Sequence, residues 1–141
     1  MNIQDAEFFK ELLAMFKLES KEHLATIDSG LNELEEMPSS EKRKEILETV
    51  FRAAHSLKGA ARTVGLMDIE PFGQSLESLF GVLKQKEINM TAQIYQLLHS
   101  TVDNLGTLIF TMDEQGKLKE DKSKLSRIMD DVNQYIRLLN A

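Results

Sequence analysis

Apolar residues recur at steps of three and four along nearly all of the 141-residue sequence, which is the period of α-helices that each bury one face. Glycines, prolines and helix-capping side chains interrupt this pattern and divide it into five segments. The spacing predicts four helices at about 5–36, 40–64, 68–87 and 91–115, and an additional helix at about 122–139. No stretch of the sequence has the alternation expected of a strand.

The connections between these segments are short, so consecutive helices are expected to lie antiparallel. We predict an all-α fold, an up-down antiparallel four-helix bundle with a fifth C-terminal helix. Residues 1–141 are expected to form a single domain, since this length and an apolar content of 42% suit one hydrophobic core. The sequence stops directly after the fifth helix, which leaves open that it is the N-terminal piece of a longer protein.

Local signals predict where the helices begin and end. Helix-capping side chains stand just before four of the apolar-periodic segments. Asp5 is expected to cap the first helix, Ser39 or Ser40 the second, Asp68 the third and Thr91 the fourth. Gly65 follows the last apolar residue of the second helix, as a left-handed C-terminal residue does, and Gly116 is expected to end the fourth.

Composition excludes several classes of function. Seventeen basic and 23 acidic residues give a net charge of −6, which disfavours nucleic-acid binding. No apolar run reaches the roughly 18 residues of a membrane span, and no secretory signal is found, so we predict a cytoplasmic protein without membrane contact. Cysteine is absent, and the three histidines lack the spacing of metal ligands, so no metal is expected. The glycine-rich phosphate-binding motifs are also absent.

One histidine lies away from the apolar face of its helix. At 100° per residue, His55 lies about 130° from the centre of the apolar stripe, which places it on the flank or the surface. Four cations lie within about 60° of it on the same helix: Lys44, Arg52, Lys58 and Arg62. We expect this rim to repel a proton from His55 and to attract an anion.

Lys58 and Gly59 each lie about one turn beyond His55. Lys58 can direct its charge at an anion on the imidazole, and Gly59 removes a side chain that would block a close approach. A glycine inside a helix costs about 1 kcal/mol relative to alanine, which argues for a purpose. Two interpretations remain open from these residues alone, a solvated helix face and a site that handles an anion.

The run from His55 to Gly65, HSLKGAARTVG, resembles the H-S-x-K-G-x-x-x-x-x-G signature of histidine-containing phosphotransfer (Hpt) domains. The preceding residues 51–54, and residues 19–24 and 30–35 of the first helix, resemble the chemotaxis kinases of the CheA type. The resemblance covers about residues 8–115. It implies that His55 is phosphorylated on Nε2 from ATP bound to a separate kinase domain, and that the phosphoryl group then passes to an aspartate of a receiver domain.

The resemblance also implies site residues beyond the histidine. In CheA-like sequences a carboxylate in an H-x-x-E pair on the next helix accepts the Nδ1 hydrogen of the phosphorylated histidine. Aligned without gaps, this pair falls on Gln74 and Glu77, so Glu77 matches and Gln74 replaces the usual histidine. Glutamine can hydrogen-bond Glu77 or a phosphate but cannot titrate near neutral pH. Lys58 would neutralise phosphoryl charge, and Gly59 would allow close approach.

The implied partners are a CheA-type kinase catalytic domain and receiver domains of the CheY or CheB type. ATP and Mg²⁺ would be bound by these partners and no cofactor by this domain, which would be a phosphoryl carrier within a longer histidine kinase. Two alternatives remain, an Hpt domain of a hybrid-kinase phosphorelay and a non-catalytic helical adaptor. The other histidines, His23 and His99, are expected to be partly buried and structural.

Overall fold

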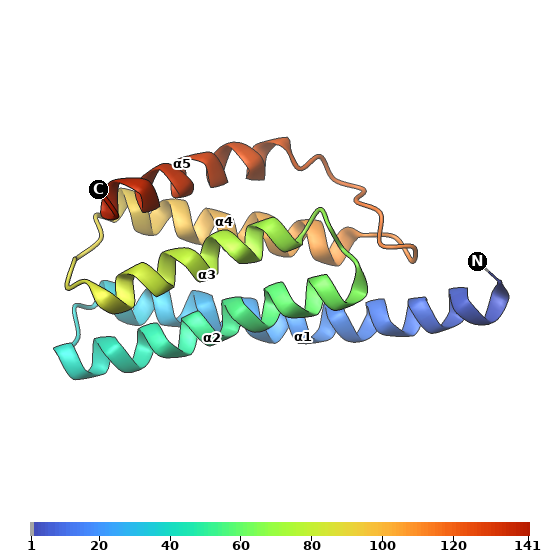
Figure 1. Ribbon diagram of the computed structural model, residues 1–141, viewed down its shortest axis with the longest axis horizontal. Coiled ribbons are helices and arrows are strands. Elements are labelled where there is room, and N and C mark those ends of the chain that lie inside the picture. The colour runs from blue at the N-terminus through green and yellow to red at the C-terminus, as the bar shows by residue number, and fades with distance from the viewer. Residues whose placement is uncertain (1) are drawn as a thin grey trace.

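A computed structural model of the chain describes residues 2–141 and contains five α-helices (Figure 1). They are α1 (Ile3–Glu35), α2 (Ser40–Val64), α3 (Glu70–Gln85), α4 (Ala92–Thr111) and α5 (Ser123–Leu139). Each helix runs opposite to the one before it, and residues 2–141 contain no strand. The predicted all-α, up-down architecture is therefore confirmed.

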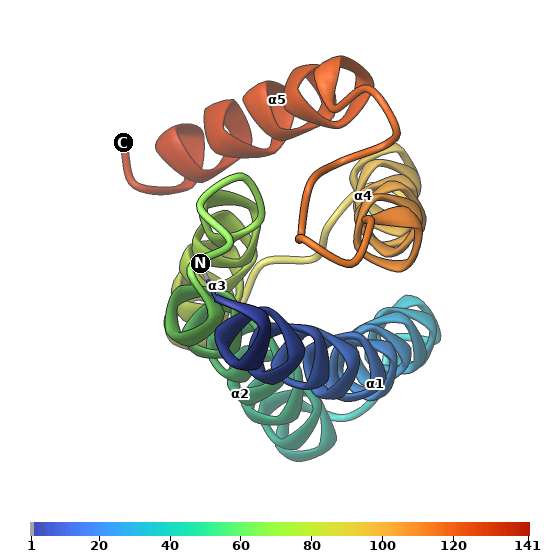
Figure 2. The same cartoon turned by 90° about the vertical axis from the view of Figure 1, so that its right-hand side faces the viewer.

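The helices enclose one hydrophobic core, and α5 covers the side of that core between α3 and α4 (Figure 2). Helix α1 packs on α2 and α4, α2 packs on α3, and α5 packs on both α3 and α4. Seen end-on in Figure 2, α5 spans the side of the bundle between α3 and α4. The largest fully buried side chains come from the first four helices and from Ile69, which directly precedes α3: Ile27, Leu31, Leu47, Leu57, Ile69, Leu76, Leu79, Phe80, Leu83, Leu98, Leu105 and Ile109. None of the described helices combines the length and apolarity needed to cross a membrane.

Short polar side chains and one glycine define most of the helix ends. The side chain of Asn2 caps α1 by accepting the backbone N–H of Asp5 at 2.8 Å, so the prediction that Asp5 is the cap is wrong. Ser39 caps α2, which ends at Gly65 with φ of 80°, and Thr91 caps α4. All three assignments agree with the sequence prediction, which placed the cap of the second helix at Ser39 or Ser40.

The third helix is shorter than the sequence suggests. It begins at Glu70 after Ile69, and no side chain caps it. Asp68, the expected cap, instead accepts a hydrogen bond from Lys122 at 2.7 Å. This ion pair joins the connection between α2 and α3 to the residue preceding α5, a long-range role that the local sequence does not reveal.

The fourth helix also ends earlier than the predicted residue 115. It stops at Thr111, and the carboxylate of Asp113 then accepts the backbone N–H groups of Gln115 and Lys117 at 2.9 and 3.0 Å. Gly116, with φ of 78°, lies in this turn and not at the end of the helix. The aspartate therefore competes with the helix for the backbone donors that follow it.

Candidate functional site

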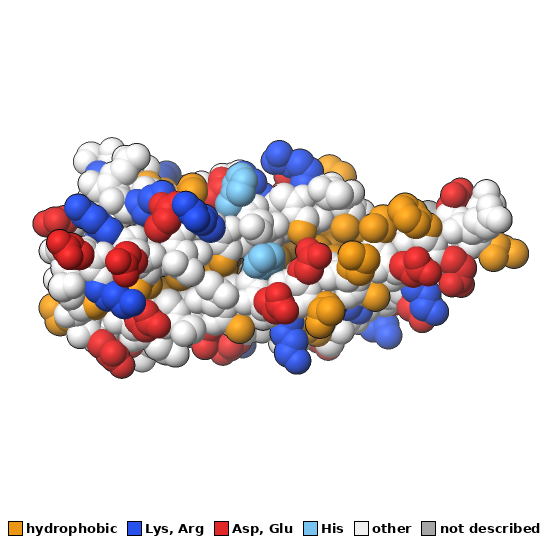
Figure 3. Space-filling model, turned by 90° about the horizontal axis from the view of Figure 1, so that it is seen from below, with side chains coloured by type: hydrophobic (Ala, Val, Ile, Leu, Met, Phe, Trp, Pro, Cys, Tyr) orange, Lys and Arg blue, Asp and Glu red, His pale blue; other side chains and the backbone are white. Residues whose placement is uncertain are grey.

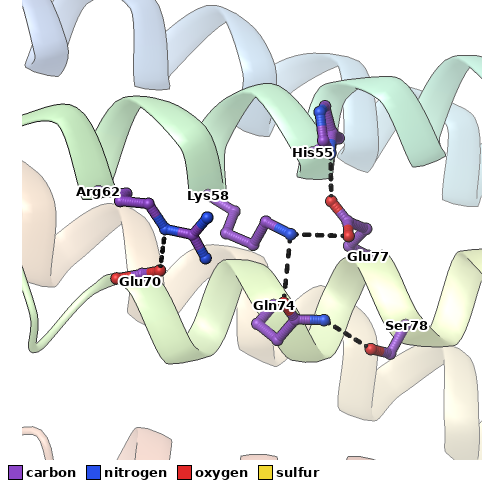
Figure 4. A network of polar contacts seen from close by, with 7 residues as sticks. All are labelled: His55, Lys58, Arg62, Glu70, Gln74, Glu77 and Ser78. Atoms are coloured by element: carbon purple, nitrogen blue, oxygen red, sulfur yellow. Dashed lines mark hydrogen bonds and ion pairs between the residues drawn. The ribbon is translucent and has the colours of Figure 1, made fainter.

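The seam between α2 and α3 carries a row of polar side chains. Helix α2 is oriented by buried Ala54, Leu57 and Ala61, which face the core. His55 and Lys58 lie beside this apolar stripe and face α3 (Figure 4). The polar residues of α3 that meet them are spaced three and four apart, so one face of each helix supplies the whole row.

His55 contacts a carboxylate of the neighbouring helix. Its Nδ1 lies 2.5 Å from Oε2 of Glu77. The imidazole is exposed, with 65% of the side chain accessible, whereas only 14% of the Glu77 side chain is accessible. Within residues 2–141, Nε2 of His55 has no hydrogen-bond partner. The arrangement therefore holds one ring nitrogen and leaves the other open.

Lys58 is enclosed between the two helices and not solvated. Its Nζ donates to Oε1 of Glu77 at 2.9 Å and to Oε1 of Gln74 at 3.2 Å, and only 12% of its side chain is accessible. The amide of Gln74 donates in turn to Oγ of Ser78 at 3.0 Å. Gln74 thus orients Lys58 and makes no hydrogen bond to His55. Ser78 was not predicted, and its only sequence signal is its position four residues after Gln74.

These contacts fix the charge of Glu77 and the tautomer of His55. Burial raises the pKa of Glu77. The hydrogen bonds from Lys58 and His55 together outweigh this effect, so the pKa of Glu77 lies below the ordinary value. An ionised carboxylate can only accept, so Nδ1 of His55 must carry the hydrogen of their contact. In the neutral imidazole, Nε2 then has the free lone pair.

The predicted cationic rim is largely neutralised. Arg52 binds Glu48 at 2.9 Å, Arg62 binds Glu70 at 2.6 Å, and Lys58 is paired as described. Three of the four cations predicted around His55 therefore have carboxylate partners, and the rim carries less unpaired positive charge than the four cations alone would give. Figure 3 shows the same interspersion more widely, with acidic and basic side chains side by side over the face seen from below α1 and α2. Glu70, the partner of Arg62, lies on α3, so this ion pair could not be predicted from the spacing of residues within α2.

Gly59 leaves an open position next to the row. A Cβ placed on Gly59 would have no atom within 4 Å. No neighbouring helix approaches it, and so this space is available to a molecule from outside the chain. Its assignment as a close-approach residue remains a prediction.

The other two histidines differ from each other. His99 is half-buried and joins α4 to α1, with Nδ1 2.7 Å from Asp28 and Nε2 2.7 Å from Glu35. Burial lowers the pKa of His99, but the hydrogen bonds to the two carboxylates raise it by more, and its pKa lies above the ordinary value. His23 is half-buried on α1. Among residues 2–141, no three histidine, aspartate or glutamate side chains are grouped as a metal site would require.

The fold and the motif define the class of protein. Residues 11–108 match the Hpt domain family, and the chain therefore belongs to that family.

Its relatives include much longer proteins of bacterial chemotaxis. The chain is 31% identical over 120 residues to the chemotaxis protein CheA of Bacillus subtilis. This match covers 85% of this chain and 17% of that protein. It is 26% identical over 116 residues to CheA of Treponema pallidum, covering 82% and 14%. The chain thus spans less than a fifth of the length of these relatives.

A solved structure has the same fold. The crystal structure of the phosphorylated P1 domain of CheA3 in complex with CheY6 from R. sphaeroides matches with a TM-score of 0.77. The match covers 92% of this chain and 98% of that chain at 20% sequence identity.

Proposed function

We propose that this chain is the phosphotransfer domain of a chemotaxis-type histidine kinase, and that it carries a phosphoryl group on Nε2 of His55. The observation that supports this most strongly is the 2.5 Å contact from Nδ1 to Glu77, combined with the exposure of the same imidazole. A carboxylate that holds Nδ1–H leaves Nε2 as a nucleophile at the surface, where another protein domain can reach it.

In the first step, the lone pair of Nε2 attacks the terminal phosphorus of ATP held by a kinase domain. The new N–P bond forms as the bond from phosphorus to the bridging oxygen breaks, and ADP leaves. The imidazole becomes positively charged while Nδ1 keeps its hydrogen, and the carboxylate of Glu77 stabilises that charge. The ammonium of Lys58 adds a compact positive charge beside the phosphoryl oxygens.

In the second step, the phosphoryl group passes to an aspartate carboxylate of a receiver domain, which breaks the N–P bond and returns His55 to its neutral state. The relatives named CheA, and the neighbouring structure solved with CheY6, favour a CheA-type kinase domain as donor and a CheY- or CheB-type receiver as acceptor. ATP and Mg²⁺ would be bound by those partners. The proposed place of action is the cytoplasm.

Incubation with a CheA-type kinase core that lacks its own phosphotransfer domain, together with labelled ATP, tests this function. We expect label that is lost in acid and survives base, as a phosphoramidate does, and that passes to an added CheY-type receiver. His55→Gln should remove the label and keep the helical circular dichroism, whereas His23→Gln and His99→Gln should keep both.

The same experiment separates the alternatives. A helical adaptor would take up no label from any kinase. An Hpt domain of a hybrid-kinase phosphorelay would take label from a phosphorylated receiver domain and not from a CheA-type core. Either result would refute the proposed place of this chain in a chemotaxis-type kinase.

A further inference from the structure

Helices α2 and α3 approach closely next to the polar row, at a glycine. A Cβ built on Gly73 would lie 3.1 Å from both Cα and Cβ of Lys58 and 3.2 Å from its backbone N. Carbon atoms in favourable contact are about 3.5–4.0 Å apart. Most of the opposing atoms belong to the helix backbone, which cannot rotate away as a side chain does. Any side chain at position 73 would therefore push the two helices apart by a few tenths of an ångström.

This contact lies inside the constellation of the proposed site. Gly73 precedes Gln74 and lies one turn before Glu77 on α3. Lys58, the residue it touches, lies one turn after His55 on α2. Figure 4 shows Gln74 and Glu77 reaching across this part of the seam toward Lys58 and His55. The separation of the helices at Gly73 thus sets how far those side chains must reach.

We infer that Gly73 is a positioning residue for phosphoryl transfer: its missing side chain lets α3 come close enough for Glu77 to hold His55 and Lys58 together. The geometric part stands on the contacts alone, and its effect on transfer rests on the proposed function. The longest contact, from Lys58 to Gln74 at 3.2 Å, has the least room to lengthen. The contact of Glu77 with His55 is short at 2.5 Å and would weaken as the carboxylate withdraws.

Two other glycines show that this constraint is local. Gly81 lies one turn beyond Glu77 on the same helix, and a Cβ there would lie 3.4 Å from the ring of Phe51. That neighbour is the edge of a half-buried side chain and not a backbone. A Cβ on Gly59 would meet nothing within 4 Å. Gly81 therefore offers a matched control, since it has the same residue type and helix and lies at the same sequence distance from Glu77.

The experiment compares Gly73→Ala with Gly81→Ala in two measurements. Nitrogen NMR of the unphosphorylated imidazole reads the fraction of neutral His55 with its hydrogen on Nδ1. The initial rate of labelling by a CheA-type kinase core reads phosphoryl transfer. Alanine raises helix propensity equally at both positions, so a purely local effect on the helix would change both variants alike.

We expect Gly73→Ala to lower the Nδ1–H fraction and to slow labelling roughly threefold to tenfold, since a displacement of about 1 Å can cost about 100-fold. Gly81→Ala should stay within about twofold of the wild type, as expected when the acceptor geometry is preserved. Equal tautomer fractions and equal rates in the two variants would overturn the inference. If the wild type takes no label, the proposed function fails, and the tautomer comparison alone still decides whether Gly73 positions Glu77.

Discussion

Glu77→Gln is the substitution that tests the role of the carboxylate most sharply. Glutamine keeps the size of the side chain and removes its charge. The wild-type carboxylate accepts from Nδ1 of His55 at 2.5 Å and from Nζ of Lys58 at 2.9 Å. An amide carbonyl is a weaker acceptor, and the amide nitrogen can donate to Nδ1, which would move the ring hydrogen to Nε2.

The size of the effect follows from the exposure of the two partners. A hydrogen bond to a charged group is worth about 1.5–3 kcal/mol, and the 65% exposure of His55 favours the lower end. About 1.5 kcal/mol corresponds to about a tenfold loss of the reactive tautomer. Loss of the charge that stabilises the cationic ring adds a further factor, so phosphorylation should slow roughly 10- to 100-fold.

The assay is the initial rate of labelling by a CheA-type kinase core, with the His55 tautomers read by nitrogen NMR in the same samples. Glu70→Gln is the matched control, because Glu70 lies on the same face of α3 but pairs with Arg62. It should change the rate by less than about twofold, as a pair away from the reacting atoms does. A wild-type rate and tautomer balance in Glu77→Gln would refute the role assigned to the carboxylate.

Two further substitutions test the charges between helices. Lys58→Ala should slow labelling about 10- to 1,000-fold by removing a stabilising charge, and should lower the free energy of unfolding in urea by about 1–2 kcal/mol, because the side chain is only 12% exposed. A stability change below about 0.5 kcal/mol would instead indicate a surface lysine. The raised pKa of His99 means that its ion pairs stabilise the fold fully below the unfolded value of about 6.5 and less as pH rises through the folded pKa. His99→Gln should therefore destabilise the protein by about 1–2 kcal/mol at pH 5.5, less at pH 9, and a difference independent of pH would contradict the argument.

Much of the fold was readable from periodicity because each helix has one buried face. The spacing of apolar residues predicts five helices and the exposure of His55, and the structure agrees on both. The helix ends are less predictable where polar side chains choose distant partners. Both the residue type and the position of Asp68 are typical of a helix cap, but its side chain binds Lys122. Nothing within a few residues of Asp68 indicates this distant partner.

The candidate site was likewise only partly predictable from the sequence. The positions of His55 and Glu77 follow from helix faces and from the resemblance to Hpt domains, and the structure brings the two side chains together. The neutralisation of the cations does not follow, because Arg62 finds its carboxylate across the seam. The enclosure of Lys58 depends on how closely α3 approaches, which is set by packing at Gly73 and not by the polar pattern.

The central claim is that Glu77 holds Nδ1 of His55 and leaves Nε2 to react. Nitrogen NMR of the phosphorylated chain, labelled with ¹⁵N in its histidines, tests this directly through the one-bond coupling to phosphorus. We predict that the coupled nitrogen is Nε2 of His55 and that Nδ1 keeps its hydrogen. Phosphorus coupled to Nδ1 of His55, or to a nitrogen of His23 or His99, would contradict the account.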